Sequence, residues 1–337
     1  MGFFRRLFGI PAPTTPETRA PQTPLSGQPP EIAAPDAPID LTPPDIKVEQ
    51  PPVNAPAHPP EMLLYGATRQ LPPLETASGK PGKHYAYGIS SDVGVVRTNN
   101  QDALFTMFSS SLSADSMPDF GLFVVADGMG GHHDGERASA LATRVVAEQI
   151  TQNFYLKALS NAPDDERPPV SEVLVAALQR ANEIVAHEIP EGGTTVTAAL
   201  LTGDLVYVAH VGDSRAYLVT SDGAEQITRD HSLVQRLIEL DQLTPDEAAS
   251  HPQRNVLYRA IGQSEHIEID TATRRLQPGC RLLLCSDGLW NQVPESEIVK
   301  TITTAPTPQD ACDLLVSMAN ERGGNDNVTV VLILVPG

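Results

Sequence analysis

Apolar and polar positions divide this chain of 337 residues into two parts. From about His84 onward, short apolar runs alternate with longer amphipathic stretches, whereas residues 1–80 show almost no periodic pattern. Short runs rich in β-branched and aromatic residues predict strands, and apolar positions three and four apart predict helices. The pattern therefore predicts a globular domain over residues 84–337, preceded by a different kind of segment.

The predicted strands are short apolar runs separated by turn residues. They cover Tyr85–Ser91, Phe120–Ala126, Thr195–Leu201, Val206–His210, Ala216–Thr220, Arg281–Cys285 and Val328–Val335. Gly203 and Asp204 separate two of these runs and predict a hairpin turn, because both residue types suit tight turns. Hairpin-length gaps favour antiparallel pairing between neighbouring strands.

Amphipathic patterns predict helices at Glu136–Asn153, Ser171–Glu188, Leu233–Leu240, Glu295–Thr303 and Gln309–Arg322. Ser232 lies three residues before Gln235, which is the spacing of a capping box. Thr244 and Glu247 repeat that spacing, and Thr307 precedes a proline at a first helical position. Strands and helices do not alternate strictly, so their order predicts an α+β fold with antiparallel sheets covered by helices.

Residues 1–80 are rich in proline and poor in apolar pattern. They hold 18 of the 31 prolines, so they bury too little apolar surface to offset their ordering entropy and are predicted to be a disordered, partly polyproline linker. The first ten residues, MGFFRRLFGI, are instead apolar and basic. They are interpreted either as a short apolar terminus without a partner or as a weak membrane or partner anchor, and one or two helical turns favour the first.

Charge and cysteine usage narrow the classes of function. The formal net charge of -19 argues against nucleic acid, whose phosphates would be repelled. No apolar run approaches the roughly 20 residues of a membrane-spanning helix, and no secretory signal is apparent. The three cysteines, Cys280, Cys285 and Cys312, lack zinc-site spacing and an even count, which favours a reducing cytoplasm.

The candidate chemistry lies in aspartates at the ends of apolar strands. Asp127, Asp213 and Asp287 each follow such a run within two residues, whereas Asp326 opens the last run. Antiparallel strands place the end of one beside the start of the next, so these carboxylates are expected to gather at one rim of a sheet. Clustered carboxylates repel unless neutralised, and hard oxygen ligands favour magnesium, manganese or calcium. For any one Asp-Gly pair a simple turn is the commoner explanation, but the recurrence favours a site.

Two further features adjoin these aspartates. The segment Asp127–His132 is dense in glycine, which lets backbone carbonyls approach a ligand, and Asp134 is predicted to cap the next helix. His132 and His133 are open to two interpretations, a general acid or a solvated loop histidine. Arg97 precedes Asp102, and a guanidinium fork suits bidentate phosphate binding, although a lone surface arginine is the simpler interpretation.

Taken in order, these motifs resemble the metal-dependent protein phosphatases, the type 2C serine/threonine family, in its bacterial form. The carrying segments are Gly94–Asp102, Val124–His132, Gly193–Thr195, Val211–Tyr217, Ile227–Ser232, His251–Asn255, Arg259–Gly262, Ser286–Trp290 and Gly324–Thr329. The family fold packs two antiparallel β-sheets face to face with helices outside. The resemblance therefore implies an α-β-β-α sandwich and hydrolysis of phosphoserine and phosphothreonine by a metal-bridged hydroxide, with two or three Mn²⁺ or Mg²⁺ ions.

The resemblance also implies a role for each candidate residue. Asp127 would bridge two metals, Asp287 and Asp326 would complete the first, the Gly128 carbonyl would bind the second, and Asp213 with Asp287 would hold a third. Arg97 would bind the substrate phosphate, Asp102 would hydrogen-bond metal-bound water, and Leu233–Gly262 would correspond to a mobile flap.

Two departures from the family pattern stand out. Gln101 replaces a common glutamate, which weakens the expected second metal site, and Met129 stands where animal members place a general-acid histidine. His132 is the candidate replacement for that histidine.

Two rival interpretations stay open at this point. One is a catalytically silent phosphatase-like binding module, against which the complete set of aspartates argues. The other is a phosphatase dedicated to a sigma-factor regulatory protein, which shares the chemistry and differs in substrate. The expected partners are phosphorylated proteins made by a serine/threonine kinase, with the chain acting as a monomer.

Overall fold

The computed structural model describes residues 84–111, 118–130, 133–160, 168–220 and 223–337. All of these residues belong to one structural unit. The linker predicted for residues 1–80 and the anchor in its first ten residues lie outside the described residues, so both stay predictions. No helix in the described part of the chain is both long and apolar enough to cross a membrane.

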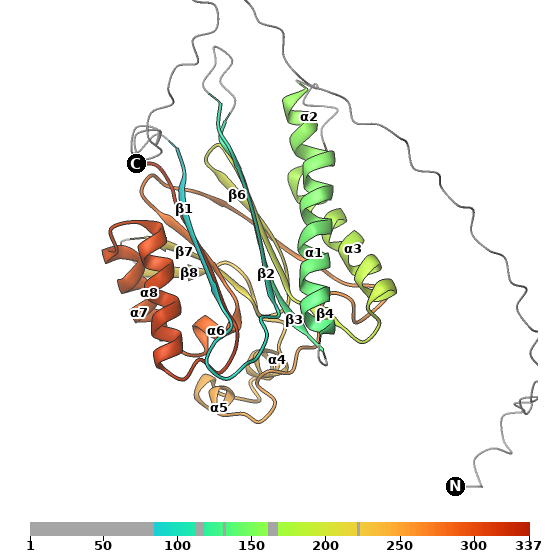
Figure 1. Ribbon diagram of the computed structural model, residues 1–337, viewed down its shortest axis with the longest axis vertical. Helices are drawn as coiled ribbons and strands as arrows, with labels where there is room; N and C mark the ends of the chain where they lie inside the picture. The colour runs from blue at the N-terminus through green and yellow to red at the C-terminus, as the bar shows by residue number, and fades with distance from the viewer. Residues whose placement is uncertain (1–83, 112–117, 131–132, 161–167, 221–222) are drawn as a thin grey trace, which may run out of the picture. The chain divides into compact units, whose positions relative to one another are not determined.

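The described residues form two antiparallel sheets that pack face to face (Figure 1). The first sheet has the order β1-β11-β10-β7-β8 and contains β1 (Ala86–Asp92), β7 (Arg215–Thr220), β8 (Gly223–Gln226), β10 (Arg281–Cys285) and β11 (Val328–Leu334). The second has the order β2-β3-β5-β6-β9, with a short β4 (Gly193–Thr194) paired to β3, and contains β2 (Asp102–Ser109), β3 (Phe120–Met129), β5 (Val196–Thr202), β6 (Leu205–Val211) and β9 (Asp270–Arg275).

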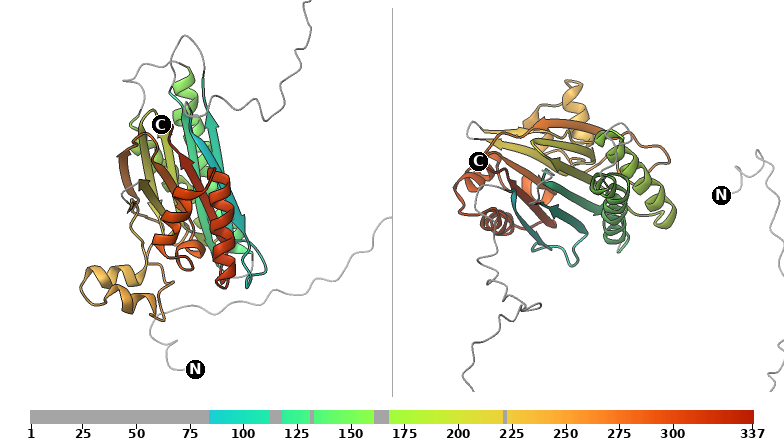
Figure 2. Two further views of the ribbon diagram at one scale, coloured as in Figure 1. Left: turned by 90° about the vertical axis from the view of Figure 1, so that its left-hand side faces the viewer. Right: turned by 90° about the horizontal axis from the view of Figure 1, so that it is seen from above.

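Helices cover the outer face of each sheet, as the views in Figures 1 and 2 agree. The second sheet is covered by α1 (Asp134–Ile150), continued by a π-helical turn η3 (Thr151–Tyr155) and α2 (Leu156–Leu159), and by α3 (Val170–Glu188). The first sheet is covered by α7 (Glu295–Thr304) and α8 (Pro308–Glu321). The short α4 (Leu233–Glu239) and α5 (Pro245–Ala249) lie at one end of the sandwich, near α6 (Asp287–Trp290).

The side chains of β3 explain why its sequence is continuously apolar. Leu122 and Val124 pack against α1 and α3, whereas Phe123 and Val125 point into the space between the two sheets. A strand that is buried on both faces has no solvent-facing positions, so it loses the polar alternation of an edge strand. The sandwich thus has three apolar layers. The candidate site residues lie at the strand ends, beyond these layers.

The structure confirms the predicted fold class, and the strand at Arg281–Cys285 has the predicted bounds. Four strands were not predicted: β2, β4, β8 and β9. Every residue of β2 is only half-buried, and β9 has a single apolar residue, Ala272, so neither shows a strong apolar pattern. The hairpin at Gly203 is confirmed, because Thr202 pairs with Leu205 and Gly203 has a φ of 61°.

The predicted caps fared differently. Thr244 and Glu247 form the complete capping box, and Thr307 caps α8. Ser232 accepts from the Gln235 backbone, but no return bond from the Gln235 side chain completes that box. The cap predicted at Asp134 is wrong, because α1 begins at this residue and its carboxylate pairs with Arg137 at 3.3 Å.

Candidate metal centre and phosphate site

The predicted aspartates come together at one end of the sandwich. Asp127 lies near the end of β3 and Asp213 follows β6, so both belong to the second sheet. Asp287 opens α6 directly after β10, and Asp326 lies two residues before β11, so these two come from the first sheet. The cluster is therefore built from strand ends of both facing sheets. The prediction that it lies at the rim of a single sheet is wrong.

Burial and mutual repulsion dominate the electrostatics of this cluster. Burial raises the pKa of Asp127 well above its usual range, and the neighbouring carboxylates of Asp102, Asp287, Asp213 and Asp326 raise it further. Burial likewise raises the pKa of Asp287 well above its usual value, with Asp213 as the strongest acidic neighbour. Burial, above all other causes, raises the pKa of Asp213 to about 7 and that of Asp102 to about 6.

Two carboxylate oxygens in the cluster lack a partner. Asp102 Oδ1 and Asp287 Oδ1 are buried and accept no hydrogen bond from the described residues. The second oxygens of both are occupied: Ser286 Oγ donates to Asp102 Oδ2 at 2.8 Å, and Asn291 Nδ2 donates to Asp287 Oδ2 at 3.1 Å. Buried acceptors without donors are costly, and a cation would satisfy them.

The side chains do not form a closed ligand cage. Among the described residues, no three His, Cys, Asp or Glu groups converge closely enough to hold one ion by themselves. Magnesium and manganese prefer oxygen donors, and magnesium typically keeps several waters while using one or two carboxylates. An open, all-oxygen cluster in which carboxylates repel one another therefore fits such ions.

The backbone at Gly128 is closely enclosed. A Cβ at this position would lie 2.1 Å from the Gly135 carbonyl oxygen, so only glycine fits. The Gly128 amide donates to the Gln101 carbonyl at 3.1 Å. One residue earlier, the Asp127 amide donates to Thr195 Oγ1 at 2.9 Å, and its carbonyl accepts from the Thr195 amide at 2.8 Å. These contacts fix the strand end that carries the central carboxylate.

Arg97 lies at the edge of the same cluster. Its Nη2 donates to Asp326 Oδ2 at 2.7 Å, and its side chain is 46% exposed. Arg97, Asp287 and Asp326 line a groove of about 720 Å³, together with residues of α4 and α5 and with Arg254. The arginine predicted to bind phosphate thus lies between the carboxylates and an open groove.

Asn327 and Ser286, which sequence reasoning did not single out, hold the site together. The Asn327 amide nitrogen donates to the carbonyls of Val93 and Asn99, and its oxygen accepts from the Gln101 amide at 2.8 Å. Ser286 donates to Asp102 and accepts from the Thr329 amide at 2.9 Å. The available signal was a polar residue directly beside a buried strand, since Asn327 is 3% exposed and Ser286 fully buried.

A buried ion pair lies on the other side of the cluster. The Arg215 guanidinium donates to both oxygens of Asp230, with Nη2–Oδ2 at 2.7 Å, and lies 3.6 Å over the Trp290 ring. Trp290 Nε1 in turn donates to the carbonyl of Asp213 at 3.1 Å. This arrangement ties Asp230, three residues before the α4–α5 segment (Leu233–Gly262), to the loop that carries Asp213.

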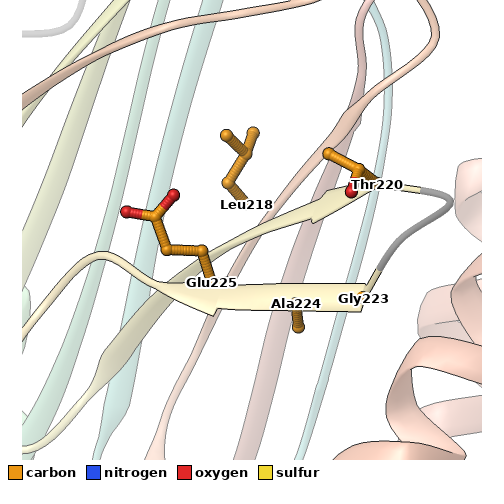
Figure 3. A pocket seen from close by; sticks show the side chains of 5 residues that line it. All are labelled: Leu218, Thr220, Gly223, Ala224 and Glu225. Carbon is orange, nitrogen blue, oxygen red and sulfur yellow. The ribbon is translucent and has the colours of Figure 1, made fainter.

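The general acid stays a prediction, because His132 lies outside the described residues. The adjacent His133 is 79% exposed at its side chain and pairs with Glu136 at 3.4 Å. Met129 ends β3 and contributes no titratable group. A smaller pocket of about 230 Å³ at the β7–β8 hairpin, lined by Leu218, Thr220, Gly223, Ala224 and Glu225, shares no residue with the groove (Figure 3).

Comparisons with known proteins agree with this geometry. The sequence pattern of the family described as Protein phosphatase 2C matches residues 95–322. The chain is 36% identical over 251 residues to the serine/threonine phosphatase stp of Listeria innocua, which covers 72% of this chain and 93% of that protein.

Two solved structures show that the similarity extends to the fold. Serine/threonine phosphatase Stp1 from Staphylococcus aureus matches with a TM-score of 0.64 and 32% identity, over 77% of this chain and 98% of that one. The catalytic domain of PstP, solved in complex with two manganese ions, matches with a TM-score of 0.59 and 32% identity, over 74% and 97%. On its ordered motifs, its fold and these relatives, the chain belongs to the protein phosphatase 2C family.

Proposed function

We propose that this chain is a metal-dependent protein phosphatase that hydrolyses phosphoserine and phosphothreonine in other proteins, using Mn²⁺ or Mg²⁺. The observation that carries the proposal is the partly buried carboxylate cluster, with its raised pKa values and its unpartnered, buried Asp102 and Asp287 oxygens. Such a cluster destabilises a protein unless it binds cations, and a relative holds two manganese ions. A catalytically silent binding module would gain nothing from a carboxylate cluster that lowers its stability.

The proposed ligands are those that the resemblance to the family implies. Asp127, Asp287 and Asp326, together with bound waters, would hold a first ion, and Asp127 with the Gly128 carbonyl would hold a second. Asp213 with Asp287 would hold a third. When bound, the ions lower the pKa of water and draw charge from the phosphoryl oxygens in the transition state.

The chain's own residues then position the reactants. Ser286 fixes one oxygen of Asp102, which leaves Oδ1 free to orient and accept a proton from the attacking water. Asp326 holds Arg97 at the groove, and the guanidinium fork exchanges this carboxylate for the substrate phosphate. Asp102 thus orients water and Arg97 binds phosphate, with Ser286 and Asp326 holding them in place.

The role of Arg97 is separable from metal binding. We expect Arg97→Ala to raise the KM for phosphopeptide about tenfold or more, with a smaller loss of kcat, because one charge-assisted phosphate contact is lost. Arg97→Lys keeps the charge and serves as the matched control. Initial-rate kinetics and inhibition by inorganic phosphate measure the effect. Unchanged phosphate inhibition in Arg97→Ala would remove this residue from phosphate binding.

The finer partners belong to the same proposal. The substrates are proteins phosphorylated by a serine/threonine kinase, and the enzyme acts as a cytoplasmic monomer, with weak membrane or partner contact through residues 1–10. The basic and apolar composition of that terminus supports the contact. Fractionation of cells that express the full chain or a chain lacking residues 1–80 tests it, and equal solubility of both would rule out a membrane anchor.

The enzymatic proposal is tested with the purified full chain. Phosphate release from phosphoserine and phosphothreonine peptides is measured with manganese, with magnesium, and with chelator. We expect release with either metal, none with chelator, and recovery after metal is restored. Release that persists in excess chelator, or its absence with both metals, would reject the proposal.

A further inference from the structure

Val95 and Val96 are two exposed apolar residues in the loop between β1 and β2, immediately before Arg97. They are 68% and 62% exposed, the two highest values among the exposed large apolar side chains of the described residues. Single exposed aliphatic residues are common on protein surfaces, but an adjacent pair beside a functional arginine is unusual. The pair therefore calls for an explanation that the proposed metal chemistry does not give.

The loop that presents the two valines is firmly held. The amides of Val95 and Val96 both donate to the Gly324 carbonyl, at 2.8 and 3.1 Å. The Gly94 amide donates to Asp92 Oδ1 at 2.8 Å, and the Asn320 side chain donates to the same oxygen at 3.0 Å. Because the backbone is already ordered and valine has a single side-chain torsion, burying these side chains against a ligand costs little conformational entropy.

The position of the pair points to the substrate. Gly324, to which both amides bind, directly precedes Asn325 and Asp326, which line the groove together with Arg97. Consecutive Cα atoms are about 3.8 Å apart, so Val96 lies one residue step, and Val95 two, from the phosphate-binding arginine. Figure 1 places this loop at the same end of the sandwich as α4 and α6.

Resting on the proposed function, we propose that Val95 and Val96 form an apolar subsite for a substrate side chain one or two residues from the phosphorylated residue. The occupant is an aliphatic or aromatic residue of the phosphoprotein, held while Arg97 binds the phosphate. Extended peptide advances about 3.3 Å per residue, which matches the one- or two-residue step between Arg97 and the valines. The enzyme consequently prefers phosphopeptides with an apolar neighbour over those with a polar one.

The test compares paired phosphopeptides on the full chain with manganese. Each pair differs by leucine or serine at a single position, from two residues before to two after the phosphothreonine. We expect the leucine peptide to have a kcat/KM about five- to tenfold higher at one of these positions, carried by KM, which is the scale of one partly buried aliphatic contact. Val95→Thr and Val96→Thr keep the branched shape, and in the double variant the leucine-to-serine ratio should fall to about one.

Two controls separate the possible outcomes. Leu314→Thr alters another half-exposed apolar residue, on α8, and should leave the ratio at its parent value. Val95→Ile with Val96→Ile should keep it. An equal loss on every peptide and on a small aryl phosphate in the threonine variant would assign the valines to support of Arg97 and overturn the subsite. A parent ratio of one at all positions would also overturn it.

The failure of the underlying function has its own signature. If the parent chain releases phosphate from no phosphopeptide, the proposed activity fails and the subsite with it, whereas release without flank preference refutes the subsite alone. Analytical sedimentation at several protein concentrations tests the remaining possible occupant of the valine pair, a second copy of this chain. Self-association that is abolished by the threonine variant would show that a second copy, rather than substrate, covers the pair.

Discussion

Asp230 and Asp287 line the same groove and are both buried, yet they differ in the partners that surround their carboxylates. Asp230 accepts three hydrogen bonds from Arg215 and another from Gln226 at 3.1 Å. Asp287 accepts one from Asn291, keeps an unpartnered Oδ1, and is surrounded by other carboxylates. Asp230 therefore has a positively charged protein partner, whereas Asp287 has none among the described residues.

We propose that this difference distinguishes a structural carboxylate from a metal ligand. A buried charge that is paired and hydrogen-bonded holds the chain in place, and removing its partner is costly. A buried carboxylate without a protein partner is costly as it stands, so its presence indicates a ligand of opposite charge. The comparison predicts that substitution at the two positions will affect different properties.

The largest effect is expected on activity. Asp127→Asn or Asp287→Asn should lower kcat by about a thousandfold or more, because each removes a charged ligand of the ions that stabilise the transition state. Phosphopeptide turnover at saturating manganese measures this, with Asp246→Asn on the exposed face of α5 as a control that keeps parent activity. Near-parental turnover by Asp287→Asn would contradict the site.

Stability should respond in the opposite order. Asp230→Asn should lower the free energy of unfolding by about 3 kcal/mol, because it leaves the largely buried Arg215 without its counter-charge. Asp287→Asn should leave the metal-free protein as stable as the parent or more so, since it removes a repelling charge. Urea unfolding in chelator measures both. If Asp287→Asn were the more destabilised variant, the distinction between the two aspartates would be wrong.

The pH dependence follows from the raised pKa values. The folded pKa is about 6 for Asp102 and about 7 for Asp213, against an ordinary value of 3.8. Between the ordinary and the folded pKa values, the metal-free folded protein therefore binds more protons than the unfolded chain. Rising pH through this window therefore removes stability from the metal-free protein. Manganese must displace these protons, so its stabilisation is weak near pH 5 and strong near pH 8.

Thermal unfolding with and without saturating manganese tests this sign. We expect the gain in Tm to be larger at about pH 8 than at about pH 5, by about 5 °C. A gain that is equal at both values, or larger at the acidic one, would show that protons and metal do not compete for the cluster.

The smallest effect is expected at Gln101. Gln101→Glu should lower the manganese concentration for half-maximal activity about two- to tenfold, because a carboxylate adds one negative charge near the second ion. The side chain is 9% exposed, so solvent screens this charge little. Gln101→Met, which has similar size and no charge, is the control. Equal or weaker metal activation in the glutamate variant would dismiss the idea.

The sequence predicted much of this site, because its signal is local. Asp127, Asp287 and Asp326 stand beside apolar runs that the structure confirms as strands, and the sequence predicted that these carboxylates gather, although at the rim of one sheet. That the runs belong to two sheets could not be inferred from the runs alone, since each is buried on both faces. Facing-sheet contacts join strand ends that no sequence spacing relates.

The supporting residues escaped prediction for a similar reason. Asn327 bonds to Val93 and Asn99, more than two hundred positions away in the chain, and only the paired β1 and β11 bring them together. The half-buried β2 was missed because its apolar residues do not alternate, although it carries Asp102. Local pattern thus picked out the proposed ligands, whereas the hydrogen bonds that orient them depend on tertiary contacts.

The most direct test of the account is calorimetric titration of the chelator-treated full chain with manganese, in parallel with Asp287→Asn and Asp230→Asn. We expect the parent to bind two or three ions, Asp287→Asn to lose at least one of them or to bind far more weakly, and folded Asp230→Asn to retain the strong sites. Absence of manganese binding to the parent, or identical binding by Asp287→Asn, would contradict the claim that Asp287, whose Oδ1 has no protein partner, is a metal ligand.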